Sequence, residues 1–113
     1  MKKLLTITLL LAIFVPSYAE VQTYESKHLS NKIDNGQIIF RKKLQRKCGF
    51  TAAHWASQHT KKEWQTYQSN GAFKEELVKM CPRAISSVKD QWIEPLYLFA
   101  VKYAKDTGSR PRC

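Results

Sequence analysis

The residues of this chain that can do chemistry are three cysteines, two neighbouring histidines and one methionine. The cysteines are Cys48, Cys81 and Cys113. In an oxidising compartment two of them form a disulfide and one remains a thiol, and the spacing does not choose among the three pairings. The chain has no Cys-x-x-Cys sequence, which a thioredoxin-like redox site needs. We therefore expect a structural disulfide, and Cys113 can link two chains into a dimer.

His54, His59 and Met80 are of the types that ligate haem iron or a metal. The two histidines are five residues apart, so on one helix they point about 140° away from each other. No acidic or thiol group completes an obvious metal set, and a zinc site wants four ligands. We expect no metal site: the histidines lie on the surface or in the core, and Met80 packs on the inner face of its helix.

A cluster of cations is the third chemical feature of the sequence. It consists of Arg41, Lys42, Lys43, Arg46 and Lys47, with no acid among them, in a chain of net charge +10. Such a cluster either docks an acidic envelope or redox protein or an anionic membrane surface, or is a solvated helix face. Nucleic acid is not an expected partner, because the aromatic residues lie on core stripes rather than among the cations.

The first 19 residues are typical of a secretory signal peptide. Lys2 and Lys3 precede an apolar run over residues 4–15, and Ser17 and Ala19 are small residues before Glu20. The run is too short to cross a bilayer. We expect cleavage after Ala19, a periplasmic or secreted protein, and a mature chain with no transmembrane segment. Removal of the two lysines leaves a net charge of +8.

The apolar spacing of the mature chain predicts helices and no strand. Residues 20–35 are expected to form a loose polar arm that ends in a turn at 34–36. Phe40, Leu44 and Cys48 recur every four residues and predict a helix over 37–47 that Gly49 ends. The cations occupy its opposite face.

The rest of the chain predicts several further short helices. Thr51 caps a helix over 52–56, and Thr60 with Glu63 forms a capping box for a helix that ends at 70–71. Two more helices are expected over 73–80 and 85–92. The last helix has Pro95 as its first residue, runs to Lys105 and is capped by Gly108. The result is an all-α fold, a small single domain of four to five short helices over residues 36–108, followed by a tail over 109–113.

Some of these elements carry recognisable motifs. Gly36 and Phe40 open the first helix of the domain, and Thr60-Lys61-Lys62-Glu63-Trp64 begins a middle helix. Tyr97, Phe99 and Tyr103 lie on the last helix. This arrangement resembles a small class I cytochrome c, in which the last helix crosses the first. The resemblance implies a cytochrome-c-like arrangement of helices over roughly residues 36–106.

A more specific resemblance rests on a combination of short motifs. These are Cys48-Gly49, His59-Thr60-x-x-Glu63-Trp64, Cys81-Pro82 and a terminal Cys113. In this respect the chain resembles small secreted bacterial proteins described as cytochrome-c-like. Covalent haem attachment needs Cys-x-x-Cys-His. Here Leu44 to Gly49 stand at that place, with one cysteine and with glycine in the histidine position, so no haem-binding residue carries over from the family.

Three functions remain open at this point. The first is a non-catalytic binding or accessory protein of the cell envelope, cytochrome-c-like and without covalent haem, which docks through the cations of residues 41–47. The second is a periplasmic electron-transfer protein that holds non-covalent haem through His54 or His59 with Met80. The third is a disulfide-stabilised structural or interaction protein. No catalytic constellation stands out, so we do not expect an enzyme.

Overall fold

The computed structural model describes the backbone of residues 18–111 and the side chains of residues 25–111. The predicted leader up to residue 17 and the terminal Cys113 lie outside the described residues. Within this part the chain is helical and contains no strand, so the predicted all-α fold is confirmed. In chain order the elements are α1 (Tyr18–Ile39), η1 (Phe40–Leu44), α2 (Gln45–Cys48), α3 (Ala52–Ala56), α4 (Lys61–Ser69), α5 (Phe73–Met80), η2 (Pro82–Ala84), η3 (Asp90–Trp92) and α6 (Ile93–Lys102).

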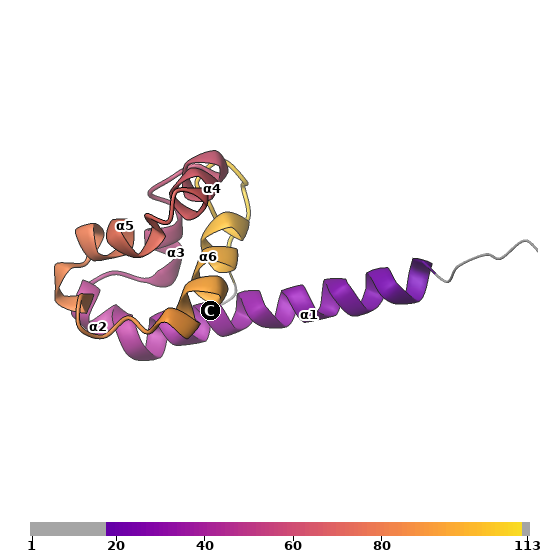
Figure 1. The fold of residues 1–113 in the computed structure, drawn as a ribbon, viewed down its shortest axis with the longest axis horizontal. Coiled ribbons are helices and arrows are strands. Elements are labelled where there is room, and N and C mark those ends of the chain that lie inside the picture. Colours follow the sequence, from indigo (N-terminus) through magenta and orange to yellow (C-terminus); the bar gives the residue numbers. More distant parts are fainter. Residues whose placement is uncertain (1–17, 112–113) are drawn as a thin grey trace, which may run out of the picture.

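The core is built around Trp55 of the short helix α3. Its ring lies 5.1 Å from those of Phe40 in η1 and Trp64 in α4, 6.0 Å from Phe73 in α5 and 6.4 Å from Phe99 in α6. All five side chains are essentially inaccessible to solvent. Offset and edge contacts at these separations are favourable for aromatic rings. One side chain therefore holds four other elements together, and α3, which carries it, lies among the other helices in Figure 1.

The first helix corrects the expectation of a loose arm and a turn. Residues 20–35 belong to α1, which continues through Gly36 without a break. Gly36 is buried because α6 crosses α1 there: an added Cβ would lie 2.1 Å from the Pro95 carbonyl oxygen. The glycine thus permits close approach of two helices instead of forming a turn. The first part of α1 projects from the body (Figure 1), and no helix within residues 18–111 is long and apolar enough to span a membrane.

The helix predicted over residues 37–47 is present, with a π-helical segment in it. Residues 40–44 form the π-helix η1 between α1 and α2. In an α-helix, side chains four residues apart differ by about 40° in their direction around the helix axis. The wider turn of a π-helix offsets this difference, so that side chains four residues apart can face the same core. Phe40 and Leu44 are both fully buried, and Cys48 packs against the same core. Gly49 ends α2 with φ of +79°, as predicted.

Both predicted helix caps are confirmed. The Thr51 hydroxyl accepts a hydrogen bond from the His54 N–H at the start of α3. At the start of α4, the Thr60 hydroxyl accepts from the Glu63 N–H, and the Glu63 carboxylate accepts from the Thr60 N–H. These bonds satisfy amides that have no partner within the helix. The helix predicted over 73–80 is α5.

The C-terminal third differs from its prediction in three places. Residues 85–92 are turns and the short η3 instead of a helix, because the burial of Ala84 and Val88 fixes this segment against the core. The last helix begins at Ile93, so Pro95 is its third residue, where the free amides of a first turn tolerate proline.

The last helix also ends earlier than predicted, at Lys102, and Gly108 lies beyond it in the tail. The chain leaves the helix there because it bonds to the start of α4. The Lys105 N–H donates to the His59 carbonyl, and the Asp106 carboxylate accepts from the Lys61 N–H. The apolar side chains of this segment face inwards: Leu96 and Phe99 are buried, and Trp92 and Tyr103 pack against the core.

The crossing of α1 and α6 predicts the effect of a single methyl group. In an open helix Gly→Ala stabilises, but in Gly36→Ala the methyl group would collide with the Pro95 carbonyl. We expect the free energy of unfolding to fall by about 1–3 kcal/mol, as in overpacked cores. Urea unfolding followed by circular dichroism measures this. Asn35→Ala, at an exposed neighbouring position of the same helix, is the control and should change stability little; an unchanged Gly36→Ala would contradict the crossing.

Candidate functional site: a basic surface

The five cations of the sequence cluster all lie on the surface of η1 and α2. Arg41, Lys42, Lys43, Arg46 and Lys47 are exposed, whereas Phe40 and Leu44 of the same turns are buried. Among the described residues, none of the five has a carboxylate within 4.0 Å; the ion pairs there involve Lys32, His59 and Lys74 instead. The positive charge on this face is therefore not neutralised by neighbouring side chains.

The disulfide brings a second segment without acids to the same face. Cys48 at the end of α2 is bonded to Cys81, with 4.9 Å between their Cα atoms, which resolves the pairing that the sequence left open. Residues 35–62 and residues 77–89 contain no Asp or Glu. The bridge joins these two segments, and the Lys47 ammonium also donates a hydrogen bond to the Ser87 hydroxyl.

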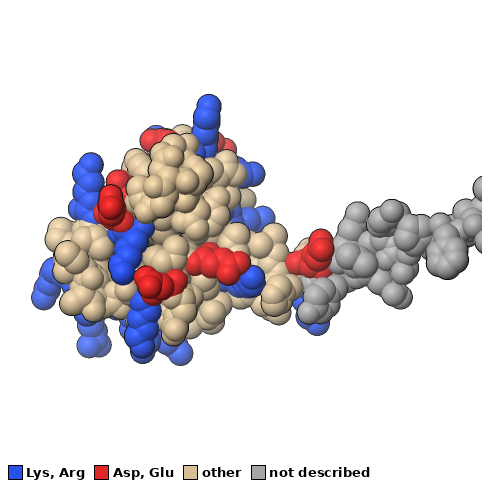
Figure 2. All heavy atoms as spheres, in the orientation of Figure 1, with Lys and Arg blue, Asp and Glu red and all other residues tan. Residues whose placement is uncertain are grey.

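The bridge adds Arg83 of η2 to the site. Arg83 is exposed and lies on the element that packs against α2. Sequence reasoning missed it, because a lone arginine 37 positions after Arg46 carries no signal until the disulfide pairing is known. We call these six residues, Arg41, Lys42, Lys43, Arg46, Lys47 and Arg83, the basic surface. Figure 2 shows lysine and arginine side chains projecting along the lower left edge of the molecule, where α2 lies in Figure 1.

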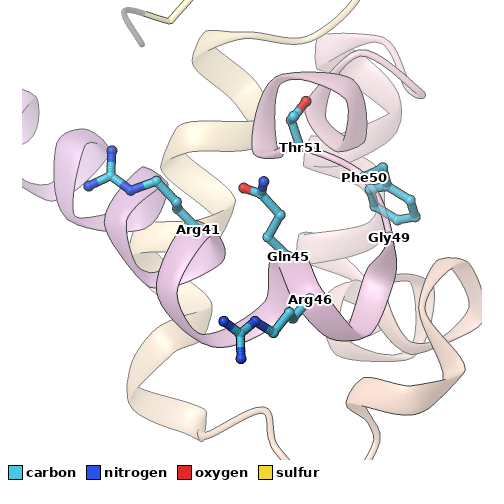
Figure 3. A pocket seen from close by; sticks show the side chains of 6 residues that line it. All are labelled: Arg41, Gln45, Arg46, Gly49, Phe50 and Thr51. Carbon is cyan, nitrogen blue, oxygen red and sulfur yellow. The ribbon is translucent and has the colours of Figure 1, made fainter.

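A recess of about 400 Å³ opens beside the basic surface. Its lining consists of Arg41, Gln45, Arg46, Gly49, Phe50 and Thr51. In Figure 3 the Gln45 amide extends towards Thr51, with Arg41 to its left, Arg46 below it and the Phe50 ring to its right. Guanidinium and amide donors at the rim suit the oxygens of a carboxylate or phosphate. Two guanidinium groups beside a recess can therefore bind a protruding anionic group.

His59 is held by two carboxylates. Its Nε2 lies 2.8 Å from Glu76 Oε1 of α5, and its Nδ1 lies 3.6 Å from Glu63 Oε2 of α4. The ring also makes edge contacts with Trp64 and Tyr67. The imidazole thereby links α4 to α5, which is a structural role for a residue that the sequence offered as a ligand.

Two groups beside His59 have perturbed acidity. Hydrogen bonds from the Thr60 backbone and side chain lower the pKa of Glu63, because they favour its charged form. Burial raises the pKa of the Tyr67 hydroxyl, and the nearby charges of Glu76 and Glu63 raise it further.

His54 and Met80 lie in other surroundings. His54 is exposed on α3, with its Nε2 3.2 Å from the Gln58 amide nitrogen and its ring beside Phe50. Met80 is half-buried at the end of α5, where it packs against the core. Within residues 18–111 no group of three or more His, Cys, Asp or Glu side chains is placed to hold a metal ion.

The surroundings of His59 do not suit an axial ligand of non-covalent haem. An axial histidine needs one ring nitrogen free for the iron, and both nitrogens of His59 face carboxylates. A haem also needs a slot between helices, and the interior here is filled by the aromatic rings around Trp55. We derive no electron-transfer step for this chain.

No family model, curated protein or solved structure matches this chain. The resemblance to class I cytochrome c accordingly rests on the motifs in its sequence.

The misfit of haem predicts a visible spectrum. We expect protein purified from the periplasm of a haem-producing host, and the same protein incubated with haemin, to show tryptophan and tyrosine absorption without a stoichiometric Soret band. The reason is that His59 is occupied and the interior is filled. Visible absorption with iron analysis measures this. A stoichiometric Soret band that is lost in His59→Ala would contradict it.

The capping box predicts how stability depends on pH. Because folding lowers the pKa of Glu63 below its ordinary value of 4.5, its contribution is present above that pH and is lost as the pH falls through the folded pKa. We expect Glu63→Gln to be less stable than the parent at neutral pH, with the difference shrinking in acid. Thermal melts between neutral pH and about pH 3 measure this. Glu75→Gln, which alters an exposed carboxylate of α5 outside the box, is the control.

Proposed function

We propose that this chain is a non-catalytic binding protein of the cell envelope, exported by its leader, which docks an anionic partner through the basic surface. The observation that carries the proposal is the set of exposed cations on η1, α2 and η2 with no carboxylate within 4.0 Å among the described residues. Unpaired cations on one face attract an anionic partner and increase its association rate.

The geometry indicates that the fold itself brings the cations of the basic surface together, and that they are not merely a run of charged residues in the sequence. The cations come from two segments whose nearest members, Lys47 and Arg83, are 36 positions apart in the sequence, and a covalent bridge joins the two segments. Part of the set lies on the π-helix η1, and π-helical turns occur often at functional sites. A recess with two arginines at its rim gives the surface a place for a specific contact.

The crossing of α1 and α6 at Gly36 supports the cytochrome-c-like part of the proposal. In the family that the chain resembles, the last helix crosses the first. Here Gly36 is in contact with the Pro95 carbonyl. We propose that the chain keeps this helix arrangement without haem, with the aromatic cluster around Trp55 filling the interior.

Charge reversal tests the proposed docking. The protein is immobilised and exposed to a solubilised envelope fraction, and the retained protein and lipid are quantified. We expect the triple variant Arg41→Glu, Lys42→Glu, Lys43→Glu to lose retention by at least about tenfold, since interface charges control the association. All three positions are exposed, so folding should survive, which circular dichroism checks.

The control has the same change in net charge on the other side of the molecule. It is the triple variant Lys61→Glu, Lys62→Glu, Lys105→Glu, at exposed positions around the start of α4. We expect it to retain the partner like the parent protein. Equal loss in both triple variants would show attraction by net charge alone and would overturn the proposed function.

A further inference from the structure

The most exposed large apolar side chain among the described residues lies next to the basic surface. Ile85 is 67% exposed, compared with 45% for Leu29 and 40% for Ile38. It lies in the turn that follows η2, between Ala84 and Val88, both of which are buried. The two buried neighbours anchor the turn, so that Ile85 is held outwards on a fixed support.

The position of this turn is set by two long-range contacts. The Cys48–Cys81 bridge fixes the start of the segment to α2, and the Lys47–Ser87 hydrogen bond fixes its far side. Ile85 lies in the chain between Arg83 and Ser87, the residue that accepts from Lys47. Lys79 and Lys89 are further exposed cations on the same acid-free stretch. The next acid along the chain, Asp90, is 3.6 Å from the Lys74 ammonium.

The turn lies at one end of the molecule. In Figure 1, α2 and the segment after α5 form the end opposite to the projecting part of α1. An end of the molecule that carries an exposed aliphatic side chain and exposed cations nearby in the chain can meet a flat surface. Neither α1 nor the other helices obstruct such an approach from this side.

We propose that this end of the molecule binds a membrane surface rich in anionic phospholipid. The cations pair with lipid phosphates, while Ile85 enters the boundary between headgroups and acyl chains. The inference rests on the proposed function, because it names the anionic partner of the basic surface. The inference adds a role for Ile85, which binding through the cations alone would not need.

The balance of charge and apolar surface favours lipid over protein. The centre of a protein–protein interface is depleted in charge and rich in apolar and aromatic side chains. Here one isoleucine stands among several lysines and arginines. Peripheral contact with anionic lipid has this balance: electrostatic attraction supplies most of the affinity, and a small inserted apolar group supplements it.

Vesicle binding tests the inference. The probe is vesicles of phosphatidylcholine with about one quarter phosphatidylglycerol, compared with vesicles of phosphatidylcholine alone. The exported protein is used, with leader removal checked by mass, and the bound fraction is measured by flotation. We expect binding to the anionic vesicles only, weakening as salt rises because exposed charges are screened.

Substitution of Ile85 distinguishes insertion of its side chain into the membrane from electrostatic attraction by the cations. We expect Ile85→Ser to lower affinity for the anionic vesicles about fivefold or more, because the variant has no apolar side chain to transfer from water into the membrane. Ile85→Leu should retain the affinity. Leu29→Ser removes an exposed apolar side chain from α1 and should have no effect. Ile85 is exposed, so Ile85→Ser should melt like the parent protein, which a thermal scan checks.

The outcomes distinguish this inference from the function on which it rests. Binding to anionic vesicles that depends on both Ile85 and the cations supports the inference. If the vesicles are not bound while the envelope fraction still yields a protein that requires Arg41, Lys42 and Lys43, the partner is a protein and the lipid inference is overturned. If Lys47→Glu with Arg83→Glu abolishes vesicle binding and Ile85→Ser leaves it unchanged, insertion of Ile85 is overturned while anionic docking stands.

Discussion

The packing of aromatic rings on Trp55 is the interaction on which the rest of this structure depends. Helix α3 has only five residues, and a helix of that length is not stable by itself in water. It persists because Trp55 contacts one aromatic ring from each of η1, α4, α5 and α6. The Nε1 group of Trp55 is buried without a partner in the described residues, a cost of about 1–3 kcal/mol that the packing offsets.

The position of the cations follows from that core. Phe40 must point inwards to reach Trp55, and Leu44 lies on the same buried line. The residues between and after them then face solvent, which places Arg41, Lys42 and Lys43 outside. The disulfide extends the exposed positive face to Arg83, while Cys81 itself is buried in the core. Packing on one side of η1 and α2 thus determines the electrostatic character of the other side.

The histidines illustrate how residue types that suit a cofactor serve structure instead. His59 is enclosed by Glu76, Glu63 and two aromatic rings, so that its ring nitrogens join helices. Its backbone carbonyl accepts from the Lys105 amide and holds the C-terminal tail against the start of α4. The interior of the domain is occupied by the buried aromatic side chains around Trp55.

The sequence by itself determined the features that depend on contacts within a few residues. Both threonine caps, the end of α2 at Gly49 and the outward cations follow from hydrogen bonds and helix periodicity over one or two turns. Only the tertiary structure decided the rest. Gly36 continues a helix because α6 approaches it, Cys48 pairs with Cys81, and Ser87 comes to lie beside Lys47. Each of these depends on residues dozens of positions apart, whose encounter no local pattern encodes.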